Sequence, residues 1–90
     1  MLKYRFSNAI KKDIELMSRR GADLNKLADA VRLLSREMLL PPHFKDHQLK
    51  GKWAGLRECH LSPDWIMIYR ITSNMLFLER TGTHSDLFKK

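Results

Sequence analysis

The sequence has almost no cysteine: Cys59 is the single thiol in 90 residues. One cysteine excludes an internal disulfide and is typical of a reducing compartment. Because Cys59 lies among apolar neighbours, it indicates a small core residue rather than a nucleophile. Long apolar runs are also missing, and none approaches the roughly 20 residues that span a bilayer. The amino terminus alternates charged and apolar residues too early for a signal peptide. We therefore expect a soluble, cytoplasmic protein.

Acidic residues are few relative to basic ones. Asp and Glu total 10 against 17 Lys and Arg, which gives a formal net charge of +7. Such an excess on a small body attracts polyanions, so nucleic acid, ribosomal RNA or an acidic protein is the expected partner. No segment combines a strong apolar face with a Lys-rich one, which argues against a membrane surface.

Six basic residues are candidate RNA contacts, because they gather on the first predicted helix and in one predicted turn. Such contacts would hold phosphates without reading sequence. The alternative for each is a solvated charge. The candidates are Lys11, Lys12, Arg19, Arg20, Lys50 and Lys52.

The first half of the chain predicts a strand and two helices. Residues 2–6 alternate apolar and charged side chains, which indicates a strand with one buried face. Ser7 is positioned to cap a helix that runs to about Arg20, and Gly21 to end it. A second helix after Asp23 carries an apolar stripe as far as Met38, before two prolines stop it. The short connection predicts an antiparallel helical hairpin.

The second half predicts strands. Residues 56–61, 65–71 and 75–81 have strand patterns, and the middle one is almost continuously apolar, as in a central strand covered on both faces. A short extended piece precedes them within residues 43–49, and a helical turn follows around 85–88. The predicted fold is α+β, one domain over residues 1–90. Its helices pack on one face of a three- to four-strand antiparallel sheet.

Four histidines lie in this second half, and their spacing does not suggest a metal site. No His-x3-His pair occurs on a helix, no cysteine pair exists, and Cys59 and His60 point to opposite faces of a strand. We therefore expect no metal and no other cofactor.

RNA cleavage without metal suits these residues better. RNA carries its own nucleophile, the 2′-hydroxyl, so a protein needs a base, an acid and a cation for the phosphate. Histidine performs acid–base work near neutral pH, and Arg stabilises charge on a phosphate. The residues that could fill these roles, if they converge, are His47, His60, Asp64, Arg80 and His84.

Three motifs carry a resemblance to a known family. Residues 45–51 (KDHQLKG) are similar to the K-D-H-x-L-x-G element of YafQ-like toxins of the RelE/ParE superfamily. Residues 55–66 (GLRECHLSPDWI) resemble their G-x-R-x-x-H-x-x-P-D-W-I element, and residues 79–88 (ERTGTHSDLF) their E-R-T-G-T-H-x-x-L-F ending. The motifs keep order and spacing, and the preceding strand and helices also fit. The resemblance therefore covers essentially the whole chain.

This resemblance implies a ribosome-dependent endoribonuclease that cuts mRNA in the ribosomal A site. It assigns His84 as general acid, and His47 or His60 as general base with Asp64 in support. Arg80 would bind phosphate, and Phe88 would position the substrate or the catalytic histidine. Alternatively, Arg80 beside Glu79 is half of a surface ion pair, Asp64 is only a turn residue, and Phe88 covers the core.

The same resemblance implies partners. These are the 70S ribosome with its mRNA, a DinJ-like or RelB-like antitoxin with an acidic, partly disordered segment, and operator DNA reached only through the antitoxin complex. Two other functions stay open: a non-catalytic relative that poisons a protein such as a topoisomerase, and a nucleic-acid-binding module without catalysis. The density of histidines argues against the first, and the lack of a helix-turn-helix pattern against the second.

Overall fold

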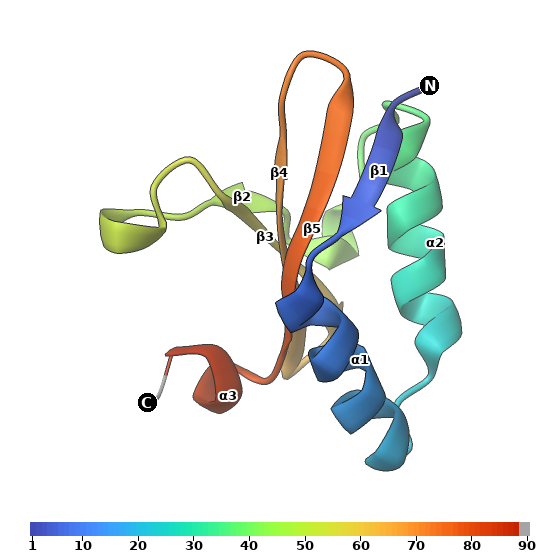
Figure 1. Cartoon of the computed structure of the whole chain (residues 1–90), viewed down its shortest axis with the longest axis vertical. Coiled ribbons are helices and arrows are strands. Elements are labelled where there is room, and N and C mark those ends of the chain that lie inside the picture. Colours follow the sequence, from blue (N-terminus) through green and yellow to red (C-terminus); the bar gives the residue numbers. More distant parts are fainter. Residues whose placement is uncertain (89–90) are drawn as a thin grey trace.

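Both long helices begin at side-chain caps that are recognisable in the sequence. A computed structural model describes residues 1–88, with α1 at Asn8–Arg19 and α2 at Leu24–Ser35. The Ser7 hydroxyl accepts a hydrogen bond from the Ile10 amide at 2.9 Å, and the Asp23 carboxylate accepts one from the Asn25 amide at 3.0 Å. These bonds satisfy amides that the first turn leaves without helical partners. The two predicted helices are confirmed, and they run in opposite directions (Figure 1).

The second helix ends earlier than its apolar stripe predicted. Glu37 has a φ of 60°, and the Glu37 and Met38 amides donate to the Leu34 and Leu33 carbonyls, each at 3.0 Å. This left-handed turn closes the helix three residues before Met38. The side chain of Met38 is consequently half exposed, so its assignment to the buried stripe was wrong.

The sheet has five strands, in the order β1-β5-β4-β3-β2. Their bounds are β1 Lys3–Phe6, β2 His47–Gln48, β3 Arg57–Ser62, β4 Trp65–Ile71 and β5 Met75–Gly82. Neighbours pair antiparallel except β1, which runs parallel to β5. The predicted N-terminal strand and the following antiparallel strands are confirmed, and only the parallel pairing of β1 with β5 was not predicted. Strand β1 leads directly into α1, and α1 packs along β5. Strand β1 consequently lies beside β5 although no hairpin connects the two strands.

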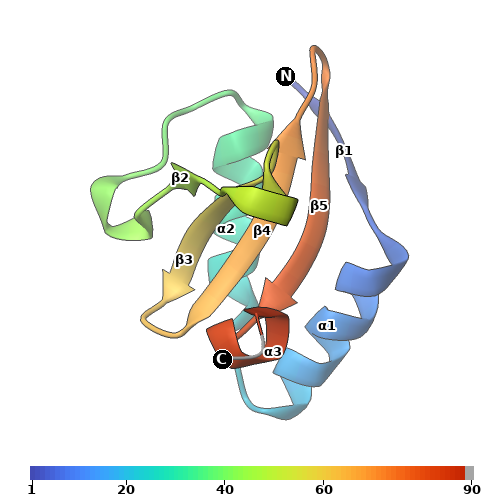
Figure 2. The same cartoon turned by 90° about the vertical axis from the view of Figure 1, so that its left-hand side faces the viewer.

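Strand β4 lies at the centre and supplies both faces of the sheet with buried side chains, as predicted for residues 65–71. Trp65, Met67 and Tyr69 join the core under α1 and α2. Ile66 and Ile68 pack on the other side with Leu87. That second face carries the 3-10 turn η2 (Gly51–Trp53) and the short helix α3 (His84–Phe88), while η1 (Pro42–Phe44) packs with the first core (Figures 1 and 2). No helix within residues 1–88 has the length and apolar content to cross a membrane.

Candidate active site

Strand β3 presents Glu58 and His60 on the face that α1 and α2 leave uncovered. Successive strand residues point to opposite sides, so Cys59 between them lies in the helix-side core. Burial there raises the pKa of the Cys59 thiol to about 12, which fits a core residue and not a thiolate nucleophile. Glu58 is only 4% exposed, and its Oε2 lies 3.2 Å from His60 Nε2. The predicted alternation along this strand is confirmed.

A polar anchor fixes the segment that carries His47. Asp46 Oδ1 accepts hydrogen bonds from the Tyr69 hydroxyl at 2.6 Å and from Arg57 Nε at 3.2 Å. One residue later, His47 Nδ1 donates to the Lys45 carbonyl at 2.7 Å. Because a carbonyl can only accept, this contact places a proton on Nδ1 and leaves Nε2 as the nitrogen that can exchange one. That nitrogen faces Glu58.

Helix α3 brings His84 to the same place from the end of the chain. Thr83 Oγ1 accepts from the Asp86 amide, and Asp86 Oδ2 accepts from the Thr83 amide, each at 3.0 Å, which forms a reciprocal cap at the helix start. His84 Nδ1 lies 3.3 Å from Asp64 Oδ1. Asp64 therefore contacts His84 from the turn between β3 and β4.

The three histidines meet at one buried carboxylate. Glu58 Oε2 lies 3.4 Å from His47 Nε2, 3.2 Å from His60 Nε2 and 3.5 Å from His84 Nε2. We call His47, His60 and His84 around Glu58 the histidine cluster. It joins the paired strands β2 and β3 to helix α3, which comes much later in the sequence. A buried carboxylate with imidazoles on three sides can hold, orient and exchange protons.

Glu58 was not among the predicted site residues. The signal was present, since strand alternation already placed Glu58 on the same face as His60. The sequence alone does not single out Glu58, because its convergence with His47 and His84 depends on the fold.

Arg80 does not pair with Glu79, as the alternative interpretation supposed. Its Nε and Nη2 donate to the two oxygens of Asp13 on α1, at 2.7 and 3.1 Å, and Glu79 instead accepts from Arg70 at 2.8 Å. The bond to Asp13 raises the pKa of the Arg80 guanidinium further. Its side chain is still 37% exposed. Glu58 of β3 pairs with Ile68 of β4, and Ile68 pairs with Arg80 of β5, so these three residues form one row across the sheet.

Phe88 closes one side of a hollow beside the cluster. Its ring packs edge-on against Trp53 at a centroid distance of 5.3 Å and lies 5.9 Å from the His84 ring. The hollow measures about 320 Å³. Its lining combines the buried carboxylate, one histidine, one lysine and apolar side chains, namely Leu49, Lys50, Trp53, Glu58, His84 and Phe88.

The predicted RNA contacts fall into two groups. Lys50 and Lys52 are exposed at η2, beside the histidine cluster. The other four lie on or directly after α1, where Lys11 and Lys12 are exposed, Arg19 pairs with Glu15, and Arg20 pairs with Asp86 at 2.7 Å.

The fold also gathers groups that can hold a metal ion, which the sequence spacing did not suggest. One ligand atom from each of Glu58, His60 and His84 lies within 4.8 Å of the others. Two imidazole nitrogens and a carboxylate suit a transition metal. Spacing along the chain missed this set because its members come from β3 and α3.

Comparison with known proteins identifies the family. Residues 2–89 match the family described as bacterial toxin of type II toxin–antitoxin system, YafQ. The chain is 46% identical to the mRNA interferase toxin YafQ of Escherichia coli K12 over 84 residues, 92% of this chain and 91% of that protein.

Solved structures agree with this match. A chain of the crystal structure of the E. coli DinJ–YafQ complex has a TM-score of 0.90 and 42% identity, covering 98% of this chain and 99% of that one. A copper-bound mutant toxin from Helicobacter pylori has a TM-score of 0.94 and 39% identity, covering 98% and 100%. The protein with the histidine cluster therefore belongs to the YafQ family of toxins from type II toxin–antitoxin systems.

Proposed function

We propose that this toxin is an endoribonuclease that cuts mRNA on the ribosome by metal-free acid–base catalysis. The observation that carries the proposal is the convergence of His47, His60 and His84 on Glu58, beside an open hollow with a lysine on its rim. The E. coli relative that shares 46% of its residues is named an mRNA interferase.

His84 is the general acid in this proposal. Both ring nitrogens face carboxylate oxygens, Nδ1 that of Asp64 and Nε2 that of Glu58, so a doubly protonated ring finds an acceptor on each side. The side chain is about one-third exposed and lines the hollow, where it can reach the leaving group. It donates its proton to the 5′ oxygen as the P–O5′ bond breaks.

Of the two candidate bases that the sequence left open, His47 and His60, this proposal assigns the general base to His47. Its Nδ1 proton is held by the Lys45 carbonyl, so Nε2 can take the 2′-hydroxyl proton. Its side chain is 49% exposed, against 19% for His60. The 2′ oxygen then attacks phosphorus, and the products are a 2′,3′-cyclic phosphate and a 5′-hydroxyl. His60 orients Glu58 from the inner side.

Cations and rings complete the site. Arg80 binds the phosphate with the N–H groups that Asp13 does not use, because the fork of N–H donors on a guanidinium can serve two partners. Lys50 and Lys52 hold the flanking backbone, and Lys11, Lys12, Arg19 and Arg20 supply ribosomal RNA contacts. Phe88 keeps His84 in place and offers a face to a base.

The remaining partners follow from the family. A DinJ-like antitoxin neutralises the toxin, as suggested by the E. coli complex of DinJ with a 42% identical YafQ. The positive charge and the proposed substrate support the 70S ribosome as a partner and the cytoplasm as the location. Operator DNA is reached only through the antitoxin complex.

A cell-free translation reaction tests the function. Purified toxin is added to a reaction with a reporter mRNA, new 5′ ends are mapped, and ribosome-free mRNA is treated alongside. In-frame cuts on translated message alone, absent with His84→Gln, are the expected result. Intact mRNA with normal ribosome loading would refute the nuclease and direct attention to protein targets.

The contact between Arg20 and Asp86 is expected to position the general acid. Asp86 caps α3, and its bonds to Arg20 and to the Thr83 amide lower the pKa of Asp86 to about 2. A carboxylate whose pKa is lowered on folding stabilises the fold at pH values above its ordinary pKa. The contact therefore persists at neutral pH and is lost only as pH falls through about 2. We expect Asp86→Ala to lower the cleavage rate about fivefold, the effect of losing a cap worth ~1 kcal/mol.

Two variants make this prediction specific. Asp86→Asn keeps an acceptor oxygen for the Thr83 amide and should restore part of the rate. Asp29→Ala removes an aspartate from an exposed ion pair on α2 and should leave the rate unchanged. Amide hydrogen exchange of α3 should rise in Asp86→Ala; a reduced rate without faster exchange would contradict the positioning role.

A further inference from the structure

Strand β5 contains a bulge directly before Arg80. Ile68 of β4 pairs with Arg80, whereas Tyr69 after it pairs with Leu78. Glu79 is consequently an extra residue of β5 that stands opposite no residue of β4. A bulge bends its strand and changes the direction of nearby side chains, and bulges are common beside active sites. Arg80, the proposed phosphate ligand, therefore lies where the regular register of the sheet is interrupted.

The outer edge of β5 changes its neighbour at the same point. Strand β1 pairs with β5 only as far as Leu78, and beyond it no strand of residues 1–88 lies on that side of β5. Helix α1 takes this place, since it follows β1 and packs along β5 (Figure 2). The backbone groups on this edge of β5 consequently need hydrogen-bond partners from α1.

Ser7, the cap of α1, and Asp13 supply these partners. The Ser7 amide donates to the Leu78 carbonyl at 3.0 Å, and the Ser7 hydroxyl donates to the Glu79 carbonyl at 2.8 Å. Past the bulge, the Thr81 amide donates to Asp13 Oδ2 at 3.2 Å. Helix α1 and its cap therefore hold the backbone of β5 before, at and after the bulge.

The same Asp13 carboxylate also holds the side chain of Arg80. Arg80 Nε donates to Oδ2 at 2.7 Å, and Nη2 donates to Oδ1 at 3.1 Å. Two parallel bonds of this kind fix the plane of a guanidinium. The Asp13 side chain is only 14% exposed, which keeps water away from this pair. The guanidinium therefore turns one edge toward Asp13 and presents the other edge, Nη1 with the second hydrogen of Nη2, to another partner.

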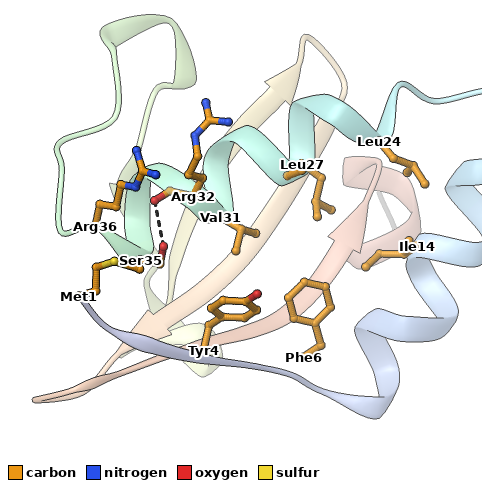
Figure 3. A pocket seen from close by; sticks show the side chains of 11 residues that line it. Met1, Tyr4, Phe6, Ile14, Leu24, Leu27, Val31, Arg32, Ser35 and Arg36 are labelled. Atoms are coloured by element: carbon orange, nitrogen blue, oxygen red, sulfur yellow. Dashed lines mark hydrogen bonds between the residues drawn. The ribbon is translucent and has the colours of Figure 1, made fainter.

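Packing on the other sides of α1 sets the direction of Asp13. Ile10 and Met17 are buried in the core between the helices and the sheet. Ile14, the residue after Asp13, points into an apolar groove that stays open between β1, α1 and α2 (Figure 3). Adjacent residues of a helix point about 100° apart. A helix rotated so that Ile14 points into this groove consequently turns Asp13 toward β5.

We propose that Asp13 is a positioning residue that holds Arg80 ready for the scissile phosphate. This role rests on the proposed function, in which Arg80 binds that phosphate. A free arginine side chain samples many rotamers, and ordering it opposes binding. Asp13 orders the guanidinium in the free toxin, so its open edge is already in place for the charge that develops on the phosphate during cleavage.

Two other roles of Asp13 predict different results. As a competitor of the phosphate for Arg80, Asp13 would slow cleavage, and its removal would raise the rate. As a purely structural residue, Asp13 would only hold the Thr81 amide, and its removal would lower the rate equally with and without Arg80. Competition is disfavoured because Asp13 uses one edge of the guanidinium and leaves the other open.

The test measures single-turnover cleavage on programmed ribosomes with Asp13→Asn. Asparagine keeps the size of the side chain and an oxygen for the Thr81 amide, but it removes the charge that holds Arg80. The maximal rate should fall about tenfold, as expected for the loss of a charged hydrogen-bond pair, while the toxin concentration at half-maximal rate stays within about twofold.

Glu15→Gln is the matched control. It makes the same change in net charge on the same helix, at a side chain that is 72% exposed and pairs only with Arg19 among the described residues. The control should cleave within about twofold of the parent rate. An equal loss in the control would overturn the proposal, since net charge would then suffice.

A double-mutant cycle separates positioning from a structural role. In an Arg80→Gln background, Asp13→Asn should change the rate by less than about twofold, because Asp13 acts through Arg80. A further loss of about tenfold in that background would overturn the proposal. A parent-like or faster rate of Asp13→Asn alone would overturn it as well.

Asp13→Glu repeats the test if Asp13→Asn melts at a lower temperature than the parent. Glutamate keeps the charge but moves the carboxylate by one methylene. With Arg80 present, this variant should cleave about threefold more slowly than the parent, and with Arg80→Gln it should cause no further loss. Equal losses in both backgrounds would again assign Asp13 a structural role.

The parent toxin distinguishes this role from the proposed function. If the parent cleaves mRNA and the losses from Asp13→Asn and Arg80→Gln multiply, the positioning role alone fails. If the parent and Arg80→Gln both leave mRNA on ribosomes intact, the nuclease proposal fails and the role of Asp13 fails with it.

Discussion

Replacing His84 by glutamine is expected to reduce mRNA cleavage by about 10²–10⁴-fold, the range associated with a general acid or base. Glutamine can fill the space between Asp64 and Glu58, but it cannot give up a proton to the leaving 5′ oxygen. Ribosome binding and antitoxin binding should persist, because the substitution leaves the basic residues and the packing of the two cores unchanged. The measurement is single-turnover cleavage on programmed ribosomes, with pelleting to measure the bound toxin.

His43→Gln is the matched control for this prediction. His43 is exposed beside two prolines and stacks on Phe44, and it makes no contact with the histidine cluster among the described residues. It should cleave like the parent toxin. A parallel loss of binding and cleavage in His84→Gln would show that His84 holds the fold of α3 and is not the proton donor.

Glu58→Gln is expected to have the second large effect, a loss of roughly 10²-fold in cleavage. The substitution keeps size and shape but removes the buried negative charge that His47, His60 and His84 share. Without that charge, His84 as the protonated acid and His47 as the base both lose the carboxylate that they contact. The rate should fall more through kcat than through KM, because Glu58 is 4% exposed and acts through the histidines that it contacts.

Glu79→Gln is the control for the second prediction. Glu79 is a partly buried glutamate on the same sheet, paired with Arg70 at 2.8 Å, and it lies outside the histidine cluster. Its variant should retain the parent rate within about twofold. If Glu58→Gln instead unfolds at lower temperature with an unaltered kcat and an unaltered pH–rate profile, Glu58 is a structural residue.

Local features of the fold were predictable because neighbouring residues determine them. Ser7 and Asp23 accept hydrogen bonds from amides two or three residues ahead, which marks the two helix starts in any tertiary setting. Alternation placed Glu58 and His60 on one strand face, and the apolar run after Trp65 identified the central strand. The parallel contact of β1 with β5 was missed because it depends on distant pairing. The early end of α2 was missed because its left-handed turn is at Glu37, where no glycine marks it.

The candidate site also has members that were predictable from the sequence and partners that were not. The three motifs named His47, His60, Asp64, Arg80, His84 and Phe88 as its members, because each motif is a short run of adjacent residues. Their partners could not be read from such runs. Glu58 between three histidines and Asp86 beside Arg20 join residues up to 66 positions apart, and Asp13 beside Arg80 joins residues 67 apart.

The sequence by itself thus determined the class of fold, the helix starts, the strand faces and the inventory of chemical groups. The tertiary structure alone decided which groups meet, that a buried glutamate lies at their centre, and that an apolar groove stays open behind the sheet. The physical reason is the separation along the chain over which each kind of interaction acts. Caps and periodicity act over one or two turns of chain, whereas the distance between a β3 side chain and an α3 side chain is set by strand register and core packing.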